Sequence, residues 1–247
     1  MVKHILLLAG LVAGCGGGPA SPPGPTVLNE SFLIESRADI DRLSQRGGAA
    51  FTIAGDLQIS GQLPSLEGLE GLTRVEGSLE IWFNPNLIWL KGLEGLESVG
   101  GKLGGRAKSA HVVEGLLIFE NAALVSLAGL ENLAAVGGGL SITGNPSLTG
   151  LADLPRLTGI EGSLDIWFND NLVSLEGLQR LARVKDFLEV SGNGALANLA
   201  GLRGVDHVGA GLIVTNNGRL PSSQAWDLAE RLRYEGLDIQ VENNGSL

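Results

Sequence analysis

The sequence has few cysteines, aromatic residues and basic residues, and each shortage excludes a class of protein. Its single cysteine, Cys15, rules out a framework of intramolecular disulfides. Aromatic residues make up 4% of the chain, so Leu, Ile and Val must fill the core of a chain that is 44% apolar and long enough to bury one. The 17 basic residues form no stripe, and the net charge of −10 argues against nucleic acid as a partner.

The N-terminus has the features of an export signal. Lys3 is followed by an apolar run from Ile5 to Val12, which is too short to span a membrane. The sequence "LVAGC" ending at Cys15 resembles the lipobox of bacterial lipoproteins. That resemblance implies cleavage after residue 14 and lipidation of Cys15, and Gly16 in place of aspartate after the cysteine implies the outer membrane. Residues 15–31, rich in Gly, Pro and Ser, are predicted to be a lipidated tether.

Residues 32–247 are predicted to be one repeat domain, because a short phrase of the form L-x-I-x-x-N recurs along them. From Leu116 to Leu212 its first residue falls at positions 116, 140, 164, 188 and 212, a period of 24 residues. After each phrase, leucines recur at every third position, which suits short 3₁₀ or extended segments. We therefore expect a β-solenoid with coils of about 24 residues and paired parallel strands.

The asparagine of each phrase is expected to lie at one corner of the coil. Stacked asparagine amides can bond the turn backbone and one another, which satisfies polar groups that a tight corner would otherwise bury unpaired. A structural role is predicted for the asparagine ladder Asn84, Asn121, Asn145, Asn169, Asn193 and Asn217.

The full repeat, G-x-L-x-I-x-x-N-x-x-L-x-x-L-x-G-L-x-x-L-x-x-V, resembles the receptor L-domain over about residues 37–247. This resemblance implies a right-handed parallel β-helix of the leucine-rich-repeat-like kind. An open apolar coil needs a cap at each end. A helix over about residues 38–45 is predicted to cap the first coil, and one over about residues 221–235 to cap the last, with Trp226 in it.

Two of the four tryptophans occupy the same place in a duplicated phrase, "EGSLEIWFNPNL" and "EGSLDIWFNDNL". The two-residue alternation of a strand turns Trp82 and Trp167 outward, with Phe119 in the same column. Such a row of exposed rings is a candidate platform for a glycan or protein ligand. The alternatives are that the rings are covered by the inserted segment around residues 104–113, or that they simply suit a strand. Phe83 and Phe168 are interpreted as packing residues.

Asp165 and Glu189 are predicted to face each other on neighbouring strands at about 5 Å, a separation compatible with glycoside hydrolysis by two carboxylates. We nevertheless expect no enzyme, because the sheet offers no evident pocket that would desolvate one carboxyl and raise its pKa. No metal or cofactor is expected. The sequence thus predicts an envelope lipoprotein acting as a binding or adhesion module, with a purely structural envelope protein and a polysaccharide-acting enzyme as alternatives.

Overall fold

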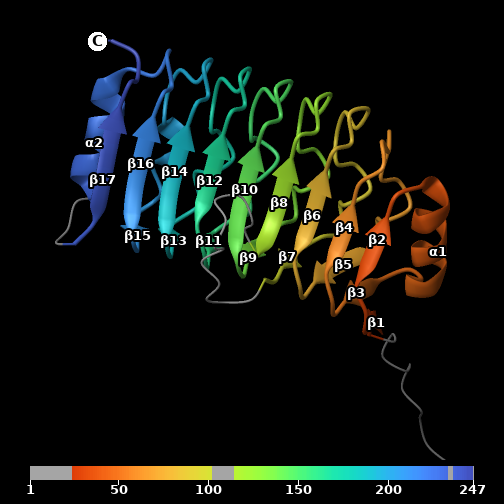
Figure 1. The fold of residues 1–247 in the computed structure, drawn as a ribbon. Coiled ribbons are helices and arrows are strands. Elements are labelled where there is room, and N and C mark those ends of the chain that lie inside the picture. The colour runs from red at the N-terminus through yellow and green to blue at the C-terminus, as the bar shows by residue number, and fades with distance from the viewer. Residues whose placement is uncertain (1–23, 102–113, 233–235, 247) are drawn as a thin grey trace, which may run out of the picture.

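The computed structural model describes residues 24–101, 114–232 and 236–246, in which the chain alternates between two parallel β-sheets. Odd-numbered strands up to β15 form an eight-stranded sheet, and even-numbered strands with β17 form a nine-stranded sheet. Figure 1 shows the strands side by side along one axis, with the two sheets forming two layers. This is a parallel β-solenoid-like fold, since each coil adds one strand to each sheet.

The strands are short. The nine-stranded sheet consists of β2 (Phe32–Ile34), β4 (Leu57–Ile59), β6 (Leu79–Trp82), β8 (Gly115–Phe119), β10 (Gly139–Thr143), β12 (Leu164–Trp167), β14 (Phe187–Ser191), β16 (Gly211–Thr215) and β17 (Asp238–Glu242). The eight-stranded sheet consists of β1 (Thr26–Leu28), β3 (Phe51–Ile53), β5 (Leu72–Val75), β7 (Ser98–Val99), β9 (Ala135–Val136), β11 (Gly159–Ile160), β13 (Arg183–Val184) and β15 (His207–Val208).

The period of the repeat sets the register of the nine-stranded sheet. Leu140 pairs with Leu164 and Ile142 with Ile166, so identical positions of successive coils stack on one another. These inward residues are fully buried, whereas the residues between them turn to the opposite face of the sheet. The core is therefore a set of stacked Leu, Ile and Val columns, as the apolar period predicts.

The leucines at every third position form tight turns rather than regular helix. The backbone N–H of Leu93 donates to the carbonyl of Leu90 at 3.1 Å, and that of Leu96 to the carbonyl of Leu93 at 2.9 Å. Each such turn places the next leucine on the same inner side of the coil. One of these segments, Ala200–Leu202, is a 3₁₀ helix. This part of each coil returns the chain to the eight-stranded sheet.

Glycine is required where these turns pass close to the coil below. Gly92 has a φ of 109°, and a Cβ at this residue would lie 2.1 Å from the carbonyl oxygen of Leu66. Gly177, at the same place in another coil, has a φ of 108° and would bring a Cβ within 1.8 Å of the Leu151 oxygen. Only glycine fits both the backbone conformation and the space.

The repeat domain begins earlier than predicted. Thr26–Leu28 pairs in parallel with Phe51–Ile53, and Phe32–Ile34 pairs with Leu57–Ile59, so a first coil precedes the coil that contains Leu57. Leu28 is 7% exposed and belongs to the core. The predicted boundary between a tether ending at residue 31 and a domain starting at 32 is therefore wrong. The strand pairing of Thr26–Leu28 and the burial of Leu28 attach this part of the predicted tether to the sheet.

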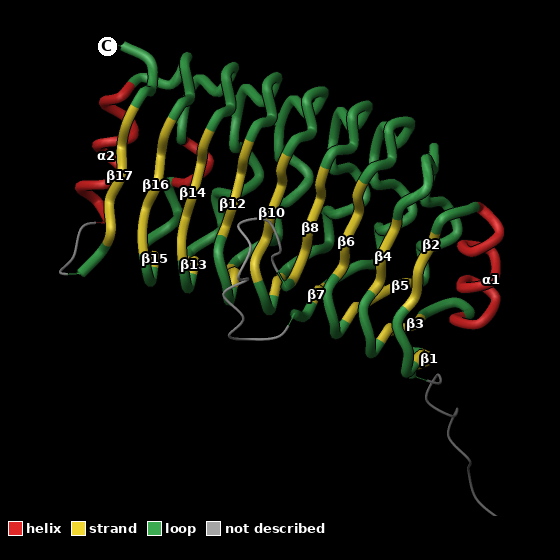
Figure 2. The backbone as a smooth tube through the Cα atoms, in the orientation of Figure 1, coloured by secondary structure: helices red, strands yellow, loops and turns green. Residues whose placement is uncertain are grey.

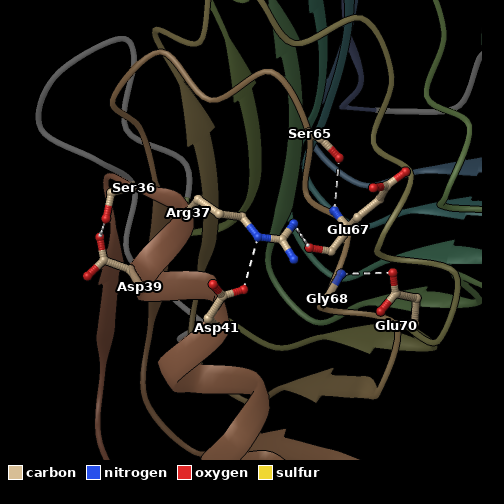
Figure 3. A network of polar contacts seen from close by, with 8 residues as sticks. All are labelled: Ser36, Arg37, Asp39, Asp41, Ser65, Glu67, Gly68 and Glu70. Carbon is tan, nitrogen blue, oxygen red and sulfur yellow. Dashed lines mark hydrogen bonds and ion pairs between the residues drawn. The ribbon is translucent and has the colours of Figure 1, made fainter.

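A helix lies at each end of the stack, as Figure 2 shows in red. Helix α1 (Arg37–Gly47) stands against β2 and buries Ile40 and Leu43. Arg37 joins it to the following coil, because its guanidinium donates to the Glu67 carbonyl at 2.6 Å (Figure 3). The same guanidinium bonds the Asp41 carboxylate within the helix at 2.9 Å. The Ser36 hydroxyl donates to Asp39 at 2.6 Å, which lowers the pKa of that carboxyl.

In the same network, two side chains of the coil bond their own turn. Ser65 accepts the N–H of Glu67 at 3.1 Å, and Glu70 accepts the N–H of Gly68 at 2.8 Å (Figure 3). These two bonds stabilise the turn at residues 65–70, whose Glu67 carbonyl accepts the hydrogen bond from Arg37.

Helix α2 (Ser222–Leu232) lies at the other end, within the range of 221–235 predicted for it. It buries the predicted apolar stripe, which consists of Ala225, Leu228, Ala229 and Leu232. Trp226 points away from this stripe and is 49% exposed. Among the residues that the structure describes, no helix is long and apolar enough to cross a membrane.

Candidate functional site

The asparagine corner is a continuous hydrogen-bonded ladder. The Oδ1 atom of Asn145 accepts the backbone N–H of Asn121 at 3.1 Å, while its Nδ2 donates to the carbonyls of Ile118 and Thr143 at 3.0 and 3.1 Å. The same pattern recurs along the column, and all six predicted asparagines are fully buried: Asn84, Asn121, Asn145, Asn169, Asn193 and Asn217. The ladder thus links successive coils along the corner where the surface residues before each asparagine, such as Phe83 and Phe168, are attached.

The ladder has two ends that the sequence pattern did not show. Leu63 replaces asparagine in the coil before Asn84, and its backbone N–H donates to the Oδ1 of Asn84 at 3.2 Å. At the far end Asn244 accepts the N–H of Asn217 at 3.2 Å. The sequence contains a sign of this last rung, because Asn244 follows the inward residue Val241 by three positions, as Asn217 follows Val214.

The residue before each asparagine has a left-handed backbone conformation. Phe83 and Phe168 both have a φ of 52°, whereas glycine occupies this position as Gly144 and Gly192 in two other coils. A bulky residue in this region is uncommon and costs about 1–2 kcal/mol. The conformation turns both phenylalanines outward, so Phe83 is 45% and Phe168 is 61% exposed. Both rings are thus exposed in part, and their interpretation as packing residues stays a prediction.

The aromatic row lies where it was predicted, on the outward face of the nine-stranded sheet. Trp82 pairs with Phe119 on the next strand, and Trp167 is one further strand beyond the intervening Thr143. All three rings are partly buried rather than fully exposed. The Phe83 ring lies 5.4 Å from Trp82 and 5.5 Å edge-on to Phe119, measured between ring centroids. The Nε1 atom of Trp82 is buried and has no hydrogen-bond partner among the residues that the structure describes.

A column of acidic residues runs beside the aromatic row. Glu80 and Trp82 share β6, and Asp165 and Trp167 share β12, so each acid faces outward two residues before a tryptophan. Asp165 also pairs with Glu189 on β14. Burial raises the pKa of Glu80 and of Glu189, against the lowering effect of hydrogen bonds from Gln58 and Ser191 respectively.

Asp165 is the most perturbed of these carboxyls. It is only 8% exposed, and within the described ranges its carboxylate accepts no hydrogen bond. Burial, with a further contribution from the charge of Glu189, raises the pKa of Asp165 to about 7. The expectation that no carboxyl of this face is desolvated is therefore wrong. Neighbouring side chains on a parallel sheet can shield a short side chain even where no deep pocket is formed.

Some predicted features lie outside the described residues. They are the signal segment 1–14, the lipidation residue Cys15 with the start of the tether, and the insertion around residues 104–113 with its basic residues Arg106, Lys108 and His111. Over the residues that are described, no group of three or more His, Cys, Asp or Glu side chains is placed to hold a metal ion. The outward face thus offers aromatic rings and carboxyl groups as its chemistry.

Comparisons of the chain with protein-family models, curated protein sequences and solved structures found no match.

Proposed function

We propose that the protein is a lipoprotein, anchored through Cys15 to the outer membrane, whose repeat domain binds a glycan or a protein through the outward face of the nine-stranded sheet. The proposal includes no enzymatic activity and no cofactor. The observation that carries it is the placement of Trp82, Phe119 and Trp167 in one outward row on a rigid scaffold. Aromatic side chains provide a large contact area at low entropic cost, and they are enriched at binding surfaces.

The two exposed phenylalanines support the same assignment. Phe83 and Phe168 occupy a backbone conformation that favours glycine, and they are 45% and 61% exposed. The left-handed backbone conformation costs free energy, and the exposed part of each ring gains nothing from burial. Strained residues cluster at functional sites, where binding compensates for their cost. The duplicated coil therefore presents a tryptophan and a phenylalanine together at two places.

For the fold, we propose a right-handed solenoid of the receptor L-domain kind. Support comes from the repeat pattern and from the strong preference of parallel β-crossovers for the right-handed connection. For the anchor, support comes from the lipobox-like residues before Cys15. Incorporation of labelled palmitate that is lost in Cys15→Ser would establish the anchor, and incorporation that persists in this variant would overturn it.

The binding function is tested with the purified protein against envelope glycans and surface-protein extracts, beside a folded Trp82→Ala/Trp167→Ala variant. The matched control is Trp226→Ala, since Trp226 is an exposed tryptophan on α2, outside the aromatic row. We expect binding by the wild type and the control that is lost in the double variant. If none of the three proteins binds, a purely structural envelope protein becomes the better assignment.

A second candidate, a polysaccharide hydrolase, is favoured by one observation, the raised pKa of Asp165 beside Glu189. A carboxyl that is protonated near neutral pH next to a second carboxyl is the arrangement used by glycosidases. Release of reducing ends from an envelope polysaccharide, abolished by Asp165→Asn and by Glu189→Gln, would establish this activity. Ligand binding without turnover would exclude it for that ligand.

A further inference from the structure

We propose that the outward face of the nine-stranded sheet binds an extended, basic segment of a partner protein, with two Lys or Arg side chains seated on two acid–tryptophan pairs. The pairs are Glu80 with Trp82 and Asp165 with Trp167. This inference rests on the proposed binding function, and it names the chemical class of the partner for the same face.

The first observation is the composition of each pair. Glu80 and Trp82 lie on one strand with one residue between them, so their side chains leave the same face about 7 Å apart. Asp165 and Trp167 repeat this arrangement on β12. An ammonium or guanidinium group between the two side chains would contact a carboxylate on one side and an indole ring on the other. The protein makes the cation–indole half of such a contact itself, because the Lys91 ammonium lies 4.8 Å from the centroid of the Trp89 ring.

The second observation is the state of Asp165. Its side chain is more than nine-tenths buried, it faces Glu189 across the strand pair, and no donor of the described chain reaches it. Desolvation and the repulsion of Glu189 both raise the free energy of a carboxylate in this position, and no hydrogen bond or cation of the described chain offsets them. A cation supplied by a partner is the group that would stabilise both carboxylates.

The third observation is the charge of the whole sheet. Over their described residues, the nine strands of this sheet contain no Lys, Arg or His, whereas the other sheet carries Arg74, Arg183 and His207. The outward acids of the nine-stranded sheet are Glu80, Asp165, Glu189, Asp238 and Glu242. A face with one sign of charge attracts a partner of the opposite sign and repels others.

The spacing of the pairs selects an extended segment. Strands β6 and β12 are three steps apart in the sheet order β6-β8-β10-β12, which corresponds to about 14 Å at the usual strand separation. Residues i and i+4 of an extended chain point to the same side and lie about 13 Å apart. A partner segment crossing the strands with basic residues at i and i+4 would therefore reach both pairs, passing over Phe119 and Thr143.

A protein segment fits these observations better than a neutral glycan. Lys and Arg keep their positive charge at neutral pH, so each can neutralise a carboxylate of a pair. A neutral sugar can stack the C–H face of its ring on Trp82 or Trp167 and donate hydroxyl hydrogen bonds to Glu80 and Asp165, but it brings no positive charge to balance a carboxylate. The glycan remains the alternative outcome of the experiment below.

The experiment measures binding of a synthetic peptide with lysines at i and i+4 to the purified protein. The comparison peptide has the same composition with lysines at i and i+2. The test variants are Glu80→Gln/Asp165→Asn, which keeps the tryptophans, and Trp82→Ala/Trp167→Ala. The matched control is Glu97→Gln/Glu176→Gln, which removes two carboxyl groups at exposed residues outside the strands of this sheet. Thermal melts verify that every variant is folded.

We expect the i, i+4 peptide to bind more tightly than the i, i+2 peptide, and its affinity to fall with added salt. Both test variants should lose about tenfold or more in affinity, and the control should stay within about twofold. Equal binding of the two peptides, or equal loss in the control, would overturn the inference by showing attraction to net charge alone. Tryptophan-dependent binding of a glycan, with no peptide binding, would overturn it and leave the proposed function standing. The absence of every tryptophan-dependent ligand would overturn both.

Discussion

The side-chain oxygen of Asn145 accepts the backbone N–H of Asn121 from the preceding coil, at 3.1 Å in a fully buried corner. This one contact links two coils, and its counterpart occurs at every rung from Asn84 to Asn217. Each asparagine side chain therefore satisfies polar backbone groups of its own coil and of the preceding one, so removing it leaves buried groups unpaired in two coils.

Asn145→Ala is expected to destabilise the fold by about 3 kcal/mol or more. The substitution leaves the N–H of Asn121 and the carbonyls of Ile118 and Thr143 buried without these partners, and each unsatisfied group costs about 1–3 kcal/mol. Urea unfolding measures the loss. The matched control is Asn171→Ala, because Asn171 bonds a carbonyl at an exposed site and should cost less than about 1 kcal/mol. Similar losses in the two variants would contradict the role given to the buried ladder.

At residue 168 we expect the glycine variant to be more stable than the alanine variant, the reverse of the usual order. Glycine in a regular element is normally about 0.5–1 kcal/mol less stable than alanine. Phe168 has a φ of 52°, where glycine alone is unstrained, so Phe168→Gly should be more stable than Phe168→Ala by about 1 kcal/mol. Thermal or urea unfolding of the two variants gives the difference. A more stable alanine variant would show that residue 168 is not held in this conformation.

The stability of the protein should fall as the pH rises from about 4 to about 7. Below pH 4 Asp165 is protonated in both the folded and the unfolded chain. Between about pH 4 and 7 only the unfolded chain has lost the proton, because folding raises the pKa of Asp165 from 3.8 to about 7. Deprotonation therefore favours the unfolded chain in this range. A shift of about three pH units corresponds to about 4 kcal/mol at most. Asp165→Asn should therefore raise the free energy of unfolding at pH 8 and leave it nearly unchanged at pH 4. Glu176→Gln, at an exposed residue, serves as the control. An unchanged pH profile in Asp165→Asn would refute the assignment.

Gly92→Ala is expected to destabilise the protein by at least about 2 kcal/mol. The new Cβ would lie 2.1 Å from the carbonyl oxygen of Leu66, at a φ of 109° that strains any other residue. Gly150→Ala is the matched control, since a Cβ at Gly150 would meet nothing within 4 Å. The control should be neutral or slightly stabilising. Calorimetry of both variants makes the comparison, and a tolerated alanine at residue 92 would mean that the coils can separate there.

Periodicity made the interior of this protein readable from its sequence. The spacing of Leu140 and Ile142 from their copies fixed the inward columns, and the strand register follows it residue by residue. The stripe of α2 was equally clear, because Ala225 and Leu228 recur at helical spacing before a glycine. Each of these patterns reflects burial, which acts on the same residue type at the same position in every coil.

The surface was predicted less well. The alternation of side chains along a strand tells which face a residue points to, but not how much of it the neighbouring side chains cover. Trp82 points outward as predicted, yet it is partly buried beside Phe83 and Phe119. Asp165 also points outward and is 8% exposed. The first coil was missed because Thr26–Leu28 follows a Gly/Pro/Ser-rich segment and lacks the asparagine that marks the other coils. These differences depend on packing across coils, which a single repeat does not encode.

Because identical positions of successive coils pair in register, the distance between two surface residues along the stack is a whole number of strand spacings. Leu140 and Leu164 pair in register, so deleting residues 140–163 would remove one whole turn and leave the two flanking turns able to pair as before. The stack would be one strand spacing shorter, and the separation of the two tryptophan-bearing turns would fall from three steps to two, or about 10 Å. Gain or loss of whole turns can thus adjust the distance between two contact points, in increments of one strand spacing, without any redesign of the interior.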